Sequence, residues 1–517
     1  MFTNRCICRS RIVAIGWGLL GAGLLMVVLA EPARAIPVFA RKYQTGCITC
    51  HSMYPKLNDV GEAFRRNGYQ FPTNEDVLVK EEPIKLGVDS YRDMFPNSIW
   101  PSNLPSIPAI SLFAQEQNIV NLRPKGQQTN WDFAFPSDIE LIGSAGFGRD
   151  ISSLWNIGFS PDGSVGVGRV FVQFDNLFSW SQDEDEDGTH LGSRWAVLPP
   201  HAMNLKIGKI DPGVVPHVIS EESFPLLQFP AMPTNTFELG QTGFALFAEQ
   251  PGIELNGVID QYWSYWVGVA NGGSAVFLPD DDNTFKDIYF RIAHKWYGYP
   301  MDGVIGTPEQ VGGAAQGAPN DPAVYNTPGL DFWRTWGLET GVFGWFGKSN
   351  IANLPYINAT GIAYDPNNTA TFKNDYFERI GLDGRFQYSN LDIYGLIYMG
   401  NDPFPGFLQD EITPAGPTQH MGFFVQADYQ FKPWILGFLR YEQVKIFNNG
   451  LADYTVASDG TLISGGEEAR VVPGVVLAIR QNLHLSSEVY IDARNVPVAS
   501  GYPEATDQWI TTLMFAY

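Results

Sequence analysis

The sequence predicts a mainly β protein: a transmembrane antiparallel β-barrel of about sixteen strands, preceded by a small α-helical segment. Three observations predict this fold. From about residue 81 to the C-terminus, short stretches alternate in hydrophobicity and are interrupted by Gly, Asn, Asp or Pro, as in barrel strands. The chain holds 53 Gly and 36 Pro, and 14% of its residues are aromatic. Glycines and prolines scattered among aromatic residues predict frequent turns. The last residues of the chain are expected to form a terminal strand, and one face of it carries Trp509, Thr511, Leu513, Phe515 and Tyr517.

Composition excludes several classes of protein. The 517 residues include 55 acidic and 33 basic side chains, and the formal charge of −22 excludes a general nucleic-acid binder, because the phosphate backbone requires a basic surface. An apolar content of 44%, with 14 Trp, 22 Tyr and 35 Phe, excludes a disordered chain. No interior stretch approaches the roughly 20 apolar residues that a spanning helix needs. A large soluble domain and a β-barrel remain.

Residues 1–35 have the organisation of a signal peptide. Three arginines precede an apolar run over residues 12–30, and the tripeptide Ala-Arg-Ala at 33–35 supplies the small-x-small pattern of a cleavage site. The mature chain is expected to begin at Ile36 with a charge of −25, because residues 1–35 hold four Arg and one Glu. The alternative interpretation of the apolar run is a retained membrane anchor.

Two cysteines lie beyond this segment, and both belong to one motif, Cys47-Ile48-Thr49-Cys50-His51. This is the spacing that attaches a c-type haem. Two thiols three positions apart on one helical turn can reach both vinyl groups of a porphyrin, and the imidazole that follows then faces the iron from the same side. The sequence therefore predicts one covalent haem c, bound through Cys47 and Cys50, with His51 as the proximal ligand of the iron.

Two other interpretations of the motif are disfavoured. A disulfide or redox pair of the thioredoxin type is disfavoured, because no βαβ pattern surrounds the motif. A structural zinc site is disfavoured as well, because such a site needs four ligands and the sequence offers no second cysteine pair for it.

A short helix is expected after the motif, covering one face of the haem. Three apolar residues recur there at helical spacing: Leu57, Val60 and Phe64. Asn58 or Asp59 can cap its start, and Gly68 is placed where a glycine would end it. Arg65 and Arg66 at its end either pair with haem propionates or form a solvated helix terminus that complements the dipole.

Residues 36–80 are expected to form a monohaem cytochrome c domain, too short to bury an independent core without the haem at its centre. Haem iron in electron-transfer cytochromes usually takes a second axial Met or His. Within this domain the only candidate besides His51 is Met53. Met53 follows His51 by two positions, and this short stretch of chain cannot carry its sulfur to the opposite face of the haem. We therefore expect any second protein ligand to come from the remainder of the chain. The candidates are Met94, which is the nearest, and His201 and His217.

Residues 81–517 form the expected porin-like barrel. The clearer strands are Leu141–Gly148, Arg169–Asn176, Ile288–Trp296, Phe377–Phe386, Leu391–Met399, Gly422–Phe431 and Val475–Arg480. Over 423–431 the odd positions are largely apolar and the even positions largely polar, so one face is expected to meet lipid and the other water. Candidate strands number sixteen or seventeen, and an even number is favoured in bacterial single-chain barrels. A soluble β-sandwich or propeller is the alternative, but no fixed repeat period indicates blades.

The connections also follow a barrel pattern. Tight turns are expected at Ser389-Asn390, Lys432-Pro433 and Gln481-Asn482, and longer polar loops at 402–417, 447–466 and 496–506. Tight turns alternating with long loops are typical of the periplasmic and external rims of such barrels. The Gly-, Pro- and Asn-rich stretch 299–330 is not assigned to either rim by this pattern.

The exported N-terminus, the single haem motif, the following Pro55-Lys-Leu-Asn58 and Asn67-Gly-Tyr69, and the long barrel-like remainder together resemble the fused monohaem cytochrome–porins of bacterial outer membranes. That family includes the proposed Fe(II) oxidases of iron-oxidising bacteria. The specific residues lie almost entirely in 36–72. The resemblance implies that the small cytochrome plugs or caps the pore, and that electrons rather than iron cross the membrane.

A one-haem protein carries out one-electron chemistry, so the expected function is electron transfer at the outer membrane. The expected partners are an extracellular donor, Fe(II), and a periplasmic cytochrome c or other electron carrier, and the expected enzymatic activity is Fe(II) oxidation. The negative charge would raise the local cation concentration near the pore mouth. Two alternatives stay open: a conduit that delivers electrons outward to extracellular acceptors, and a passive solute porin with a structural haem plug.

Acidic runs at 183–187, close to His190, and at 280–282 contain carboxylates of the kind that hard cations prefer. Charge runs are more often solvated loops, which is the favoured interpretation of both.

Overall fold

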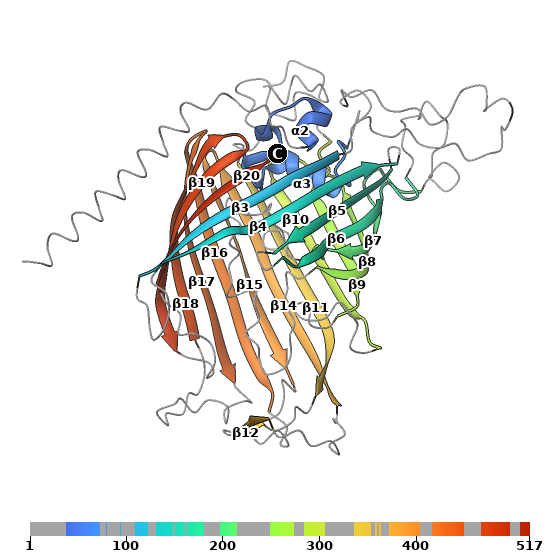
Figure 1. Cartoon of the computed structure of the whole chain (residues 1–517). Coiled ribbons are helices and arrows are strands. Elements are labelled where there is room, and N and C mark those ends of the chain that lie inside the picture. Colours follow the sequence, from blue (N-terminus) through green and yellow to red (C-terminus); the bar gives the residue numbers. More distant parts are fainter. Residues whose placement is uncertain are drawn as a thin grey trace, which may run out of the picture.

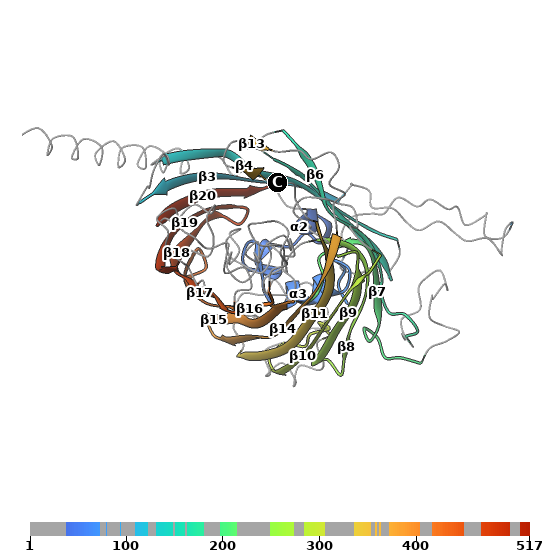
Figure 2. The same ribbon diagram turned by 90° about the horizontal axis from the view of Figure 1, so that it is seen from below.

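The computed structural model describes the chain over the following residues: 38–72, 79, 94, 109–122, 131–147, 150–160, 163–179, 197–214, 249–272, 284–304, 336–352, 357–358, 361–362, 372–403, 416–448, 467–496 and 507–517. Over these residues the architecture is a closed antiparallel β-barrel that holds a small helical segment within its ring (Figures 1 and 2). The expected fold class is confirmed.

The N-terminal segment consists of α2 (Val38–Tyr43), η1 (Cys47–Thr49), β1 (His51–Met53), β2 (Lys56–Leu57) and α3 (Asp59–Arg66). The barrel strands are β3 (Ala109–Asn121), β4 (Trp131–Gly146), β5 (Ile151–Phe159), β6 (Val165–Phe174), β7 (Asn204–Ile210), β8 (Gln250–Ile259), β9 (Trp263–Ala270), β10 (Asp287–Tyr297), β11 (Gly337–Ala352), β14 (Phe372–Tyr388), β15 (Leu391–Asp402), β16 (Thr418–Lys432), β17 (Ile435–Asn448), β18 (Glu467–Arg480), β19 (Leu483–Val496) and β20 (Gln508–Ala516). A small hairpin, β12 (Ile357–Asn358) with β13 (Gly361–Ile362), stands apart from the barrel wall.

In the described residues the barrel has sixteen strands, the expected number, and each strand pairs antiparallel with its neighbours. The ring closes through β20, which pairs with β3, so the last strand of the chain lies beside the first strand of the wall. Closure leaves no edge strand with unpaired backbone groups, which is the condition for a sheet to stand in lipid. All seven strands expected from the sequence lie within or largely within these strands.

Alternation along the strands places apolar side chains on the outer face and polar side chains in the lumen, because successive residues of a strand point to opposite faces. In β16 the even positions from Thr418 to Gln430 are buried, whereas the odd positions are partly or fully exposed. In β20 Trp509 and Leu513 face outward and Ile510 and Met514 inward. The exposed outer surface carries large apolar residues that include Val267, Ile288, Ile292, Ile380, Leu382 and Val425.

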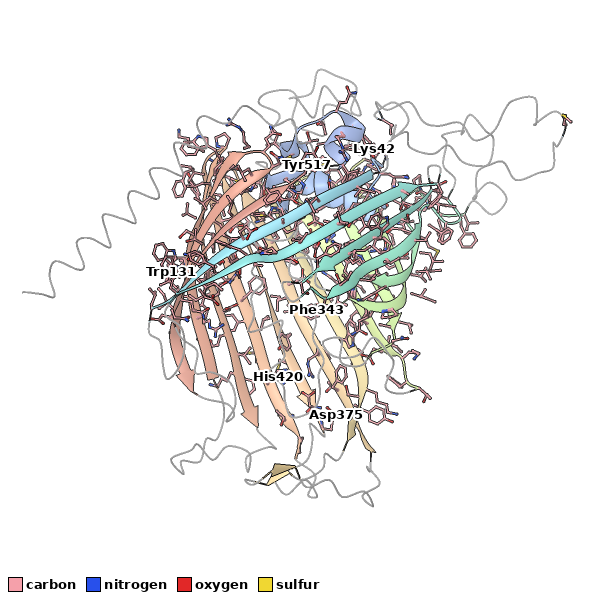
Figure 3. The ribbon with its side chains drawn as sticks, in the orientation of Figure 1. Lys42, Trp131, Phe343, Asp375, His420 and Tyr517 are labelled. Atoms are coloured by element: carbon pink, nitrogen blue, oxygen red, sulfur yellow. The ribbon has the colours of Figure 1, made fainter. Side chains whose placement is uncertain are left out.

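The helical segment lies at one end of the barrel, where the C-terminus also lies (Figures 1 and 3). Tight turns at 260–262, 389–390, 433–434 and 481–482 meet this end, while β12 and β13 lie at the opposite end (Figure 1). The three expected tight turns are confirmed, with the middle one shifted by one residue to Pro433-Trp434. The three expected long loops join strand ends at the opposite rim. Two longer connections, after β6 and after β10, depart from the pattern, because they leave from the rim that carries the helical segment.

The helical segment buries its apolar residues against the barrel wall. Tyr43, Val60, Phe64 and other residues of the segment form one cluster with wall residues such as Phe171 and Ile210. Rings within the cluster pack edge to face, as Tyr43 and Phe64 do at 5.7 Å between centroids. The expectation that the haem alone is the centre of this domain is therefore incomplete, because the described core is shared with the barrel.

Of the unassigned stretch 299–330, residues 299–304 lie at the same end as the helical segment and contact α3. The rest of that stretch, the expected signal peptide and the expected cleavage site lie outside the described residues. Within the described part of the chain, no helix has the length and apolar character that crossing a membrane requires.

Candidate haem site

The Cys47–His51 motif folds as one tight turn. Residues 47–49 form a short 3-10 helix, and the Cys50 amide donates to the Cys47 carbonyl at 3.2 Å, so the two thiols project from one turn. Asn58 holds this turn from behind: its Nδ2 donates to the carbonyls of Ile48 at 3.2 Å and Thr49 at 3.1 Å. Both cysteines and the histidine that follows them therefore lie on one short, well-braced piece of backbone.

Asn58 also starts the helix that follows. Its side-chain oxygen accepts from the Gly61 amide at 3.0 Å, which is an N-cap bond for α3. A Cβ at Gly61 would stand 2.1 Å from the Cys50 carbonyl oxygen, so only glycine allows α3 to lie this close to the motif. Gly68 follows the C-cap residue Asn67 with a φ of +63°, as expected for a glycine that ends a helix.

His51 begins the small β1–β2 hairpin, and its ring is fixed from within that hairpin. Its Nδ1 lies 2.8 Å from the Pro55 carbonyl oxygen, and its ring contacts the Tyr54 ring at 5.0 Å between centroids. A hydrogen bond from one ring nitrogen to a backbone carbonyl sets the tautomer and orients the other nitrogen for a metal. The nitrogen that would ligate iron is then Nε2.

These residues fit a covalent haem. The thiols of Cys47 and Cys50 are not joined in a disulfide, and both lie next to a histidine whose Nδ1 is engaged. Beside them, the Ser52 hydroxyl and the Gln430 side-chain oxygen are buried without a hydrogen-bond partner among the described residues. Buried polar atoms of this kind normally have a partner, so they are consistent with a further polar group at the site.

The electrostatic setting of the cysteines does not suit a thiol redox pair. Burial raises the pKa of the Cys50 thiol to about 12, and burial also raises the pKa of Cys47. Reactive thiols have a lowered pKa, because the thiolate is the nucleophile. Over the described residues there is also no group of three or more His, Cys, Asp or Glu side chains arranged to hold a metal ion directly.

The arginines at the end of α3 contact protein groups. Arg65 forms an ion pair with Glu62 at 2.9 Å, and Arg66 donates to the Met301 carbonyl at 3.2 Å while lying over the Trp266 ring. The prediction of a solvated helix terminus is therefore wrong, because the wall of the barrel covers this end of α3.

Two buried charge clusters fasten the segment to the wall. The Lys56 ammonium lies 2.6 Å from Asp428 Oδ2 on β16 and 2.7 Å from Asp392 Oδ2 on β15. Asp59 lies 2.8 Å from the Lys295 ammonium on β10 and 3.7 Å from the Arg385 guanidinium on β14. Each group is a charge that is costly to bury alone, so these pairs hold the segment in one position.

Among the described residues, the two distal-ligand candidates from the sequence, Met94 and His201, make no described contact with the motif, and Met53 does not act as a distal ligand either. Met53 packs into a cluster with Leu436, Phe438 and neighbouring wall residues, and Met94 is 68% exposed and makes no described contact with the motif. His201 lies in the connection between β6 and β7, where its carbonyl accepts from Val258. His217 lies outside the described residues.

One histidine near the motif was missed by the sequence analysis. His484 on β19 is 2% exposed, and its Nδ1 lies 2.8 Å from the Tyr54 carbonyl oxygen. The preceding turn reaches the motif as well, because the Gln481 side chain accepts from the Cys47 amide at 3.1 Å. The sequence did contain a signal for His484: it follows a predicted tight turn and occupies an inward-facing position of a strand with alternating hydrophobicity.

Deeper in the lumen, further ion pairs cross between strands. Arg291 on β10 contacts Asp383 at 2.6 Å and Glu339 at 3.0 Å, and Arg379 contacts Asp402 at 2.9 Å. His420 lies beside this second pair, 3.6 Å from Asp402, and well away from the helical segment (Figure 3). The acidic runs at 183–187 and 280–282 lie outside the described residues, as does His190.

No protein-family model matches this chain, and no curated protein matches its sequence. Solved structures with a similar fold include the outer membrane channel DcaP of Acinetobacter baumannii, at 8% identity and a TM-score of 0.47, covering 79% of this chain and 96% of that one. OmpF of Salmonella typhi, in a complex with daunomycin, is 11% identical with a TM-score of 0.44, covering 81% and 98%. An anion-selective porin from Comamonas acidovorans is 10% identical with a TM-score of 0.45, covering 80% and 100%. The fold assignment itself rests on the strand pairing of this chain.

Proposed function

We propose that this protein is an electron-transfer protein of the bacterial outer membrane, in which a monohaem cytochrome c segment is held inside a porin-type barrel. It takes electrons from an extracellular donor, with Fe(II) as the donor we favour, and passes them to a periplasmic carrier. The observation that carries the proposal is the Cys47–His51 turn, with two unpaired thiols and a histidine oriented through Nδ1, fixed inside a closed barrel.

The barrel supports a location in the outer membrane. Its outer face carries large apolar residues, its strands close without an edge, and its lumen is polar, as in transmembrane barrels. Tight turns and the C-terminus share one rim, which is the periplasmic rim in such barrels. The helical segment therefore faces the periplasm, and a donor from outside would approach through the lumen from the long-loop rim.

A haem c bound at this site would supply one-electron exchange at its iron. The chain's own residues then have defined tasks. Cys47 and Cys50 would hold the group covalently, His51 would ligate iron, and the Pro55 carbonyl would orient His51. The carboxyl groups buried in the described lumen outnumber the basic groups, which favours cations over anions on the path from the long-loop rim.

A passive solute porin is the second candidate. The barrel architecture by itself favours it, because sixteen strands enclose a lumen wide enough for water. Against it stand the helical segment within the ring and the fully buried side chains of Arg291, Arg379 and Asp402, since groups that line an open aqueous channel are exposed to water. A conduit that runs outward would use the same residues and differs only in the haem potential relative to its partners.

The test uses the full-length protein purified in detergent and reconstituted in liposomes. Electron transfer predicts a covalent haem by mass spectrometry, a spectral change of that haem on adding Fe(II), and little solute flux. Solute flux with no spectral response to Fe(II) would favour the passive porin. Absence of an attached haem in protein produced with a cytochrome c maturation system would contradict the proposal outright.

A further inference from the structure

His484 occupies the wall of the barrel next to the candidate haem site. It is the second residue of β19, directly after the tight turn 481–482, and its side chain is 2% exposed. The same turn is tied to the motif, because Gln481 Oε1 accepts from the Cys47 amide. A Cβ at Gly46 would stand 3.2 Å from that same oxygen, so the turn and the motif are in close contact.

The two histidines are held in the same way. His51 Nδ1 lies 2.8 Å from the Pro55 carbonyl oxygen, and His484 Nδ1 lies 2.8 Å from the Tyr54 carbonyl oxygen. Two consecutive carbonyls of one loop therefore engage the same nitrogen of two imidazoles from different parts of the fold. This is how proteins prepare a histidine to ligate a metal through Nε2, because the engaged Nδ1 fixes the tautomer and the ring direction.

Tyr54 lies against both rings. Its centroid is 5.0 Å from that of His51 and 5.9 Å from that of His484, and both ring pairs meet edge to face. Both imidazoles thus contact the same residue, although 433 positions separate them in the sequence. The His484 ring also contacts the backbone of Arg480 and Gln481, beside the turn that precedes it.

The other described histidines are placed elsewhere. His201 is in the β6–β7 connection, and His420 is beside Asp402 in the deeper lumen (Figure 3). His294 lies between Trp263 and Trp296, with ring centroids at 4.2 and 4.6 Å. None of these three has a described contact with residues 47–57.

Met514 is a competing side chain. It pairs in register with His484 across β19 and β20, is 2% exposed, and belongs to a cluster against which Tyr54 packs. Its neighbours in that cluster are the apolar residues Phe113 and Ala516, so apolar packing explains why a methionine is buried at this position.

We infer that His484 supplies the second axial ligand of the haem iron, through Nε2, so that the barrel wall rather than the cytochrome segment completes the coordination. The inference rests on the proposed function, because it requires a haem at Cys47 and Cys50. Its consequence is that the haem joins the N-terminal segment to β19, and that the barrel controls the haem potential, which depends on the axial ligand.

The test compares His484→Ala with wild type in the full-length holoprotein. The variant is expected to keep its covalent haem by mass spectrometry, to change from a low-spin to a high-spin absorption and electron paramagnetic resonance spectrum, and to recover the low-spin spectrum when imidazole is added. His294→Phe, a histidine change outside the lumen, is the matched control and should leave the spectrum unchanged. A low-spin spectrum that persists in His484→Ala with haem attached would overturn the inference.

A second variant, His484→Met, covers the case in which the alanine variant does not fold. A methionine ligand is expected to keep the haem low-spin and to raise its reduction potential, which a purely structural role of His484 would not do. Met514→Leu should leave the spectrum as in wild type, and loss of the low-spin state there would assign the ligand to Met514 and overturn the inference. A wild-type protein without haem would instead contradict the proposed function itself.

Discussion

Lys56 in the helical segment and Asp428 on β16 form a buried ion pair, with 2.6 Å between Nζ and Oδ2, although 372 positions separate them. The Lys56 side chain is 4% exposed and the Asp428 side chain 3%. Asp392 lies 2.7 Å from the same ammonium, and the Tyr394 ring lies below it at 3.9 Å. The Lys56 ammonium therefore holds the segment in the barrel through two carboxylates and an aromatic ring of the wall.

Lys56→Met should release the helical segment from the wall. The change leaves two carboxylates without their shared cation, and breaking a buried pair in this way typically costs about 3–5 kcal/mol. We expect residues 38–72 to become sensitive to protease in folded, detergent-purified protein, while the barrel keeps its resistance to unfolding in SDS. Lys432→Met, at an exposed position of β16, is the control and should behave as wild type.

A double variant distinguishes charge from packing. Lys56→Met with Asp428→Leu removes both partners, and replacing a buried pair by apolar groups is often close to neutral. Protease resistance should return in large part, because Asp392 keeps its ion pair with Arg385 at 2.8 Å. If the double variant is as sensitive as the single one, the lysine acts through its shape and not its charge.

His51→Ala should abolish electron transfer and leave the barrel assembled. The imidazole is the expected proximal ligand, while the strands form the wall through their own pairing. The measurements are the haem absorption spectrum with and without Fe(II), and heat-modifiable migration in SDS for barrel assembly. Failure of the variant to insert in membranes would show that the two parts fold as one unit, contrary to a domain boundary near residue 80.

Gly61→Ala should disrupt the turn that carries the cysteines. The added Cβ would stand 2.1 Å from the Cys50 carbonyl oxygen and 2.7 Å from Leu57 Cδ2, so α3 would have to move away from the motif. We expect a destabilisation of the segment on the order of 1–3 kcal/mol, as for overpacked sites, and reduced covalent haem per polypeptide by mass spectrometry. Gly158→Ala is the matched control, because no atom lies within 4 Å of its added Cβ. Equal haem content in both variants would contradict the packing argument.

Docking of the segment should weaken as pH rises from about 4 to about 7. Burial raises the pKa of Asp302 to about 6 and that of Asp175 to about 7, and both lie at the C-terminal end of α3. A carboxyl group whose pKa is raised in the folded state binds more protons than in the unfolded state, so its stabilising effect is lost as pH passes the folded pKa. A difference of one in pKa corresponds to about 1.4 kcal/mol, so the two groups together are expected to lower the free energy of unfolding by several kcal/mol over this range.

The measurement is urea-induced release of the segment, followed by protease sensitivity at several pH values. Asp175→Asn and Asp302→Asn should each reduce the slope with pH, because an amide does not titrate in this range. A slope that stays the same in the double variant would assign the pH dependence to other groups.

The local patterns of the sequence were sufficient for most of the fold. Alternation over 423–431 predicted which side chains of β16 face lipid, because a strand has a side-chain period of two whatever it pairs with. The tight turns at 389–390 and 481–482 were likewise predictable, since turn residues act on their own neighbours. The Cys47–His51 motif and its capping Asn58 follow the same rule, because their geometry is set within a dozen residues.

What the sequence alone did not indicate are the contacts between the segment and the wall. Lys56 with Asp428, Asp59 with Lys295, and His484 with the Tyr54 carbonyl each join residues more than two hundred positions apart. Their meeting depends on barrel register, on the number of strands and on how deep the segment lies in the ring. The alternation indicates that Asp428 and His484 point inward, but only closure of the ring determines which inward-facing residues stand opposite one another. The tertiary structure alone therefore decided what surrounds the candidate haem site, because a barrel brings distant strands to one lumen.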